Sequence, residues 1–183
     1  MDEIVKQALK KWPNVPHCYG WLALDARGDW YMRDERIQHA GPFPQVKGSR
    51  INHDKLLAFI GRNYGHDEQG AWFFQNGPQR VYVELEASPW IWRLQSDPGS
   101  SIVVVTSHTG LPAEPGETFV DESGRLFLAS DLGLGIVHTL DMNVASDLVE
   151  RGVWKPADAR FEALVERFAY RLSPAGDRPR PGA

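Results

Sequence analysis

The sequence of 183 residues predicts an α+β protein built from two related subdomains. Segments that alternate apolar and polar side chains lie between segments whose apolar residues recur at helical spacing. One turn pattern also occurs three times, with Asp three residues before Gly and a large apolar triplet soon after. These observations predict two antiparallel hairpin-plus-helix units, because a repeated local pattern indicates a repeated supersecondary unit.

Helices are expected at four places, each marked by apolar residues on one stripe and a residue that favours a helix start. The first lies within the segment from Met1 to Trp12, where Pro13 ends the pattern. The other three begin, in order, after an N-cap at Asn52, after an N-cap at Asp141, and at Pro156.

Strands are expected between these helices. The segment Arg80–Glu86 alternates strictly, so Val81, Val83 and Leu85 share one face and polar side chains share the other. This pattern predicts a half-buried antiparallel strand. Further strands are expected at three β-branched or aromatic segments, namely Trp90–Leu94, Ser101–Thr106 and Gly135–Leu140.

The repeated turn occupies Asp25–Met32, Asp67–Phe74 and Asp121–Leu128. Its Asp side chain accepts hydrogen bonds from the backbone that follows, and its Gly supplies the positive φ of a tight turn. We therefore expect three hairpins that join antiparallel strands, with Gly28, Gly70 and Gly124 at positive φ. Chance recurrence in a β-rich chain is the alternative to duplication.

The expected domain organisation follows from these elements. Residues 1–75 form an N-terminal α+β subdomain, and residues 76–172 form a mainly β subdomain with terminal helices. The tail at 173–183 is rich in proline, glycine and charge, which predicts disorder.

Composition excludes several classes of protein. A net charge of -4 and a pI near 5.9 argue against a nucleic-acid partner, which would need a basic surface. No apolar segment approaches the length of a membrane helix, and the N-terminus lacks a signal-peptide pattern, so we expect a cytoplasmic protein without a membrane partner. The single cysteine, Cys18, cannot form an internal disulfide, and we expect it to be buried and slow to react.

No strong catalytic or cofactor motif is present. The sequence has no phosphate-binding G-x-x-x-x-G-K-[ST], no G-x-G-x-x-G, no H-E-x-x-H and no C-x-x-C. Its six histidines are scattered, with no pair at metal-ligand spacing. We therefore expect no catalytic residues, no bound metal and no cofactor.

Aromatic and cationic residues on the predicted strands provide a candidate binding site. Tryptophan rings suit the floor of a cleft between the subdomains, arginines supply cationic groups, and an amide or a strand-end histidine supplies hydrogen bonds. The expected ligand is planar and anionic. Core filling is the alternative for each tryptophan, and a turn is the alternative for the asparagine and the histidine. The predicted ligand-binding residues are Arg80, Trp72, Asn76, Trp92, Arg93 and His108.

The order of elements from Gly20 to Trp90 resembles a proteobacterial family known only as a domain of unknown function. The resemblance rests on two Asp-x-x-Gly-x-Trp turns around a helix, followed by Pro78-x-Arg-Val-x-Val-x-Leu-Glu-x-x-Pro-Trp. Gln79 replaces an acidic residue of that pattern, Ala87 replaces Asp, and Trp90 stands where the family has Phe.

This resemblance implies an α+β fold of two related subdomains, of which the C-terminal one is similar to a pleckstrin-homology barrel. It also implies a nucleotide-like ligand at the interface of the subdomains and a signalling role. The departures at Gln79 and Ala87 fall near that implied interface.

The function that the sequence favours is therefore a non-catalytic regulatory or signalling protein with a small-ligand cleft between its subdomains. The first alternative is a protein–protein interaction module, which an exposed apolar patch would favour. The second is a hydrolase with a site of histidine and carboxylates. The sequence leaves the oligomeric state open.

Overall fold

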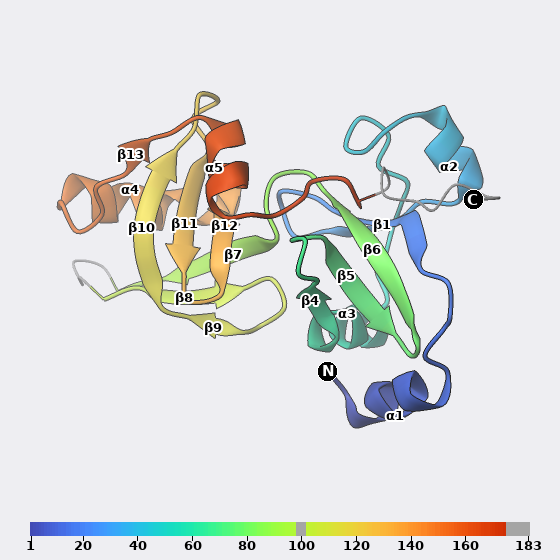
Figure 1. The fold of residues 1–183 in the computed structure, drawn as a ribbon. Coiled ribbons are helices and arrows are strands. Elements are labelled where there is room, and N and C mark those ends of the chain that lie inside the picture. The colour runs from blue at the N-terminus through green and yellow to red at the C-terminus, as the bar shows by residue number, and fades with distance from the viewer. Residues whose placement is uncertain (98–101, 175–183) are drawn as a thin grey trace. The chain divides into compact units, whose positions relative to one another are not determined.

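The computed structural model describes residues 1–97 and 102–174 of the chain, and its elements are shown in Figure 1. The chain divides into two compact units. The first comprises Met1–Asp25, Asp29–Glu86 and the residues from Tyr170 onward, and the second comprises Ala26–Gly28 and Ala87–Ala169. The expected boundary at residue 75 falls inside the strand Trp72–Asn76, which pairs with Gln79–Leu85 of the same unit.

The first unit contains one mixed sheet of six strands in the order β3-β2-β1-β6-β5-β4. β1 and β6 pair in parallel, and the other neighbours pair antiparallel. The strands are β1 (Cys18–Leu24), β2 (Trp30–Met32), β3 (Ser49–Arg50), β4 (Tyr64–His66), β5 (Trp72–Asn76) and β6 (Gln79–Leu85). The helices of this unit are α1 (Glu3–Lys11), α2 (Glu35–Ala40) and α3 (Asp54–Arg62).

The second unit contains a sheet of seven strands in the order β13-β10-β11-β12-β7-β8-β9. β12 pairs with β7 in parallel, and so does β10 with β13. The strands are β7 (Trp90–Gln95), β8 (Val104–Ser107), β9 (Pro112–Ala113), β10 (Pro115–Val120), β11 (Leu126–Ser130), β12 (Gly133–Val137) and β13 (Ala157–Asp158). Its helical elements are the short 3-10 helix η1 (Thr139–Asp141), α4 (Met142–Glu150) and α5 (Phe161–Arg167). A mixed α+β fold is therefore confirmed.

The three repeated turns are tight hairpins, as predicted. They join β1 to β2, β4 to β5, and β10 to β11, all antiparallel. Gly28, Gly70 and Gly124 have φ of 82°, 76° and 74°. In each turn the Asp carboxylate accepts a hydrogen bond from the backbone N–H four residues later, at 2.8 to 2.9 Å.

The helix starts are only partly as predicted. The first helix is confirmed as α1, and Asp141 does precede α4. The prediction of Asn52 as an N-cap is wrong, because His53 takes that place and its Nδ1 accepts a hydrogen bond from Leu56 N. Pro156 does not start a helix either, since the residues after it form β13 beside β10.

Strands are present at the predicted segments, but their neighbours in the sheet and their burial differ from the prediction. β6 covers the predicted segment but lies in the centre of its sheet, where it pairs in parallel with β1 as well as antiparallel with β5. Its second half is buried on both faces, so Glu84 lies in the interior rather than on a solvated face. β8 overlaps the segment expected from Ser101 to Thr106 and ends one residue beyond it, and Ser101 itself lies outside the described residues.

The chain returns to the first unit after residue 169. Leu85 N on β6 donates to Leu172 O at 2.8 Å, and Arg171 N donates to the turn carbonyl of Gly70 at 3.0 Å. Tyr170 is buried in the same segment. The described start of the expected tail, Ser173 and Pro174, follows directly, and the residues after it lie outside the described part of the chain.

A partly exposed histidine with a buried imidazole Nε2 lies in the second unit. His108 follows β8, contacts the ring of Trp90 with centroids 5.9 Å apart, and its Nδ1 accepts from Ile91 N at 3.4 Å. Burial lowers the pKa of His108 from 6.5 to about 3. The neutral imidazole therefore belongs to the folded state at neutral pH.

Replacement of the turn glycines tests the hairpins. Gly124→Ala should lower the free energy of unfolding by about 1 to 2 kcal/mol, because an L side chain is strained at this φ even with open space around it. Gly28→Ala should cost more, since its Cβ would also lie 3.1 Å from Cβ of His108. Urea denaturation measures both. The control is Gly65→Ala in β4, where the φ is ordinary and no atom lies within 4 Å of the new Cβ. Equal losses in all three variants would contradict the argument.

The buried histidine predicts acid sensitivity of the second unit. The folded pKa of about 3 lies below the unfolded value of 6.5, so the unfolded state binds the proton first and stability falls as pH drops from 6.5 toward 3. The loss should approach about 1.4 kcal/mol per pH unit. We expect His108→Asn to flatten this slope in urea titrations at several pH values, whereas exchange of the exposed His39 for Asn should leave it unchanged. An unaltered slope in His108→Asn would refute the assignment.

Candidate functional site

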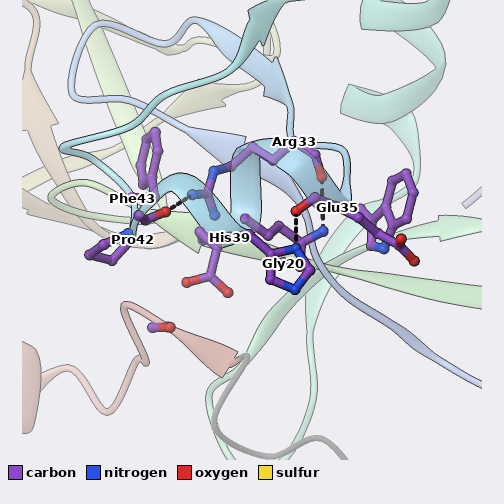
Figure 2. A pocket seen from close by; sticks show the side chains of 11 residues that line it. Gly20, Arg33, Glu35, His39, Pro42 and Phe43 are labelled. Atoms are coloured by element: carbon purple, nitrogen blue, oxygen red, sulfur yellow. Dashed lines mark hydrogen bonds between the residues drawn. The ribbon is translucent and has the colours of Figure 1, made fainter.

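A pocket of about 610 Å³ lies in the first unit and is lined by residues that are far apart in the sequence (Figure 2). Its walls come from β1, from the segment that follows β2, from α2 and the loop after it, and from β6. The lining residues used below are Gly20, Trp21, Arg33, Glu35, His39 and Glu84. We call it the Arg33 pocket.

Arg33 is the buried cation of this pocket. It follows β2 directly, and its N–H donates to Trp21 O at 2.9 Å, which continues the pairing of β2 with β1. Its side chain donates from Nε to Val46 O at 3.2 Å and from an Nη to Gly41 O at 2.7 Å. Only 4% of the residue is exposed, and burial lowers the pKa of its guanidinium. A guanidinium has five N–H donors, so these two bonds leave donors for a ligand.

Glu84 is the buried anion of the same pocket. It lies on β6 with 5% of its surface exposed. Its carboxylate opposes the effect of burial on Arg33 by raising the pKa of that guanidinium. A carboxylate is rarely buried unless an opposite charge lies near, so the two residues place both signs of charge in one hollow.

Short-range bonds hold the rim formed by α2. Asp34 caps the helix by accepting from Ile37 N at 2.9 Å. Gln38 Nε2 donates to Arg33 O at 2.9 Å, and His39 Nδ1 lies 2.6 Å from Glu35 O (Figure 2). Because a carbonyl oxygen can only accept, Nδ1 of His39 carries the proton in this contact. Sequence analysis gave no indication of this six-residue helix.

An irregularity in β1 shapes the opposite wall. The pairing of β1 with β6 shifts register between Cys18 and Leu22, and Gly20 within that interval has a φ of 77°. Bulges of this kind re-aim side chains and are frequent beside functional sites. Trp21 follows the bulge and is 38% exposed, which is unusual for so large a ring.

A partly exposed ion pair anchors the far end of the loop that leaves the pocket. Lys47 Nζ donates to Asp25 Oδ2 at 2.9 Å and to Glu86 Oε2 at 3.2 Å. Burial by itself would lower the pKa of Lys47, but these bonds to carboxylates outweigh it and raise the pKa. Tyr31 also donates to Asp25 Oδ2. The loop carrying Gly41 and Val46, which bind Arg33, is thereby fixed at its end.

Three of the six predicted ligand-binding residues lie in the first unit. Trp72 is buried in β5, and its ring lies 4.7 Å from that of Tyr64. Asn76 is exposed at the end of β5, beside the turn at Gly77. Arg80 lies over the ring of Phe73 at 4.4 Å and lines a smaller pocket of about 460 Å³ that also contains Asp67 and Glu68.

The other three lie in the second unit. Trp92 is fully buried, and its Nε1 donates to Leu128 O at 2.8 Å, while Gly135 beneath it leaves no room for any side chain. Arg93 forms two hydrogen bonds to Asp141, from Nε at 2.6 Å and from an Nη at 3.1 Å. His108 is the partly exposed histidine described above. A ligand role for the six residues, and a cleft between subdomains, stay predictions.

Arg33 and Glu84 were not among the residues predicted for the site. Glu84 stands in the alternating strand, where its neighbours made it look solvent-facing. Arg33 lies in no recognisable motif. Glu84 could have been recognised as buried only if β6 had been known to pair with a strand on each side. The sequence does not show that pairing.

The described residues contain no cluster of three or more His, Cys, Asp or Glu side chains that could hold a metal ion. Within the same part of the chain, no helix has the length and apolar character needed to cross a bilayer. Cys18, expected to be buried, is partly exposed at the start of β1 and lines a hollow beside the Arg33 pocket.

Comparisons with known proteins place the fold without naming a ligand. No curated protein matches the chain. A solved structure of a DUF1285 family protein from Silicibacter pomeroyi DSS-3 is similar at a TM-score of 0.50 and 13% identity, with 81% of this chain and 85% of that chain covered. Another, a DUF1285 family protein from Shewanella baltica OS155, has a TM-score of 0.45 and 15% identity, with 69% and 91% covered.

At this level of identity the first of these structures shows a shared fold and nothing about function. A family model described as "Protein of unknown function (DUF2946)" matches residues 1–175, which is nearly the whole chain. The protein therefore belongs to this family, whose model bears the name DUF2944.

Proposed function

We propose that the protein binds a small zwitterionic molecule in the Arg33 pocket and acts as a non-catalytic regulatory protein. The observation that carries the proposal is the pair of buried opposite charges, Arg33 and Glu84, on the wall of one open pocket. A guanidinium in such a place recognises a carboxylate through directed N–H donors. A carboxylate in such a place accepts from an ammonium group.

The charges of the pocket favour a zwitterion over a simple anion. Arg33 is joined by two carboxylates, the buried Glu84 and the exposed Glu35. A ligand that carries only negative charge would be attracted by Arg33 and repelled by both Glu84 and Glu35. A ligand that brings an ammonium as well is attracted by both carboxylates in addition to Arg33.

The size of the pocket agrees with a metabolite. Small-molecule sites commonly have volumes of about 300 to 1,000 Å³ and contain a few fixed polar groups among apolar walls. The Arg33 pocket has about 610 Å³ and also presents the rings of Trp21 and Phe43. Three of its polar side chains, Arg33, Gln38 and His39, are held by backbone carbonyls, so they need little ordering when a ligand binds.

The site expected from the sequence is a second proposal with weaker support. Arg80 faces a pocket, as a binding role requires, but Asp67 and Glu68 share that pocket and disfavour the planar anion or nucleotide-like ligand that was expected. The duplication of the subdomains and the likeness of the second to a pleckstrin-homology barrel are proposals of the same rank. The three equivalent hairpins support the duplication.

One observation favours the interaction-module alternative. Ile4 and Trp12 of the α1 segment are 72% and 50% exposed, which leaves apolar surface on a helix. The hydrolase alternative has less support. The rings of His39 and His66 hydrogen-bond to backbone carbonyls, and His53 and His138 cap helical turns. A cytoplasmic location remains a proposal.

A thermal-shift screen tests the zwitterion. Glycine, β-alanine and 4-aminobutyrate carry both charges, whereas acetate and ethylamine carry one each. We expect at least one of the zwitterions to raise the melting temperature more than either single-charge compound at equal concentration. A ligand at a hundred times its dissociation constant adds about 2.7 kcal/mol.

The nearly isosteric Glu84→Gln variant then locates the binding. It should weaken the zwitterion by about 1.5 to 3 kcal/mol, the range for hydrogen bonds to charged groups, when measured by calorimetry on protein shown by circular dichroism to be folded. Glu68→Gln makes the same chemical change on an exposed residue of the same unit and should leave affinity unchanged. Equal affinity in Glu84→Gln and wild type, or no binding of any zwitterion, would remove the proposal.

A further inference from the structure

A second hollow adjoins the Arg33 pocket. It has a volume of about 770 Å³ and is lined by the segment from Pro13 to Tyr19 together with Trp21. Trp21, which is 38% exposed, is the one lining residue that the two hollows share. We call the second hollow the Tyr19 pocket.

The lining of the Tyr19 pocket differs in chemistry from that of its neighbour. Two prolines, a valine and two aromatic rings provide most of its walls. Its lining residues include no Asp, Glu, Lys or Arg. Burial and the nearby Arg80 lower the pKa of His17, the one titratable imidazole there, which keeps it neutral at pH 7. The Arg33 pocket, by contrast, holds three charged side chains.

The ring of Tyr19 gives this hollow a fixed wall. It stacks on Tyr82 with centroids 4.6 Å apart and an interplanar angle of 9°. Tyr82 is itself buried and donates from its hydroxyl to Asp67 Oδ2 at 2.9 Å. A ring held in this way loses little freedom when an apolar group packs against it.

A charged hollow and a mostly apolar hollow that share Trp21 fit a ligand with two unlike ends. We infer that the ligand is an α-amino acid with a large apolar side chain, whose charged end lies between Arg33 and Glu84 and whose side chain passes Trp21 into the Tyr19 pocket. This inference rests on the proposed function, to which it adds the ligand class. Small polar amino acids would fill the charged end alone.

An affinity series tests the apolar end. L-phenylalanine should bind wild-type protein about ten- to a hundredfold more tightly than glycine, because burial of a large apolar side chain is worth about that factor. N-acetyl-L-phenylalanine, which lacks the ammonium, and phenethylamine, which lacks the carboxylate, should both bind at least tenfold more weakly than L-phenylalanine. Calorimetry or ligand-observed magnetic resonance measures the four dissociation constants.

Two tryptophan variants show where the side chain lies. In Trp21→Ala the affinity ratio of L-phenylalanine to glycine should fall to a fewfold. Trp12→Ala removes another exposed tryptophan that lines neither pocket and should keep the full preference. The pair thereby separates loss of the apolar wall from a general effect of removing a surface indole.

The single cysteine reports occupancy of the Tyr19 pocket directly. Cys18 lines this hollow, is partly exposed, and is the only thiol of the chain. Saturating L-phenylalanine should slow its reaction with iodoacetamide severalfold, whereas saturating glycine should not. Equal affinities for glycine and L-phenylalanine, or equal labelling rates, would overturn the inference while leaving the proposed function intact. If no zwitterion bound to the wild-type protein, or if Glu84→Gln left the affinity for the zwitterion unchanged, the proposed function itself would be overturned.

Discussion

The fold depends on one local constraint that occurs three times: a turn aspartate whose carboxylate accepts a hydrogen bond from the backbone four residues on. The bond from Asp29 N to Asp25, and its equivalents at Asp67 and Asp121, fixes where each hairpin reverses. Because side chains alternate along a strand, the position of the turn also decides which residues face inward. Asp25 extends this role by its ion pair with Lys47, through which the first hairpin fixes the loop that holds Arg33.

The turns could be predicted because their cause is local. Asp and Gly at fixed spacing satisfy the backbone without help from distant residues, and the same is true of the apolar stripe of α1. The strand at β6 was also recognised from its alternation. Its parallel pairing with β1 was not predicted, because nothing within either segment records which strand lies beside it. The burial of Glu84 follows from that partner and was missed for the same reason.

The candidate site shows the same contrast between features with a local cause and features that depend on long-range contacts. Arg33 is held by carbonyls of Gly41 and Val46, 8 and 13 residues further along the chain, and interacts with Glu84 on another strand. The predicted residues were chosen instead for aromatic or cationic character on strands. Tryptophan rings are large enough to fill a core, and Trp92 does so completely. Residue type alone therefore did not distinguish a ligand floor from a packed interior.

The return of the chain to the first unit has a consequence for how the protein is made. Residues 87–169, the main part of the second unit, lie between two stretches of the first, and Leu172 contributes a backbone acceptor to Leu85 on β6. A ribosome thus releases the whole of the inserted stretch before it releases the segment that completes the earlier unit. The Arg33 pocket, which Ser173 helps to line, therefore becomes complete only after those later residues have emerged.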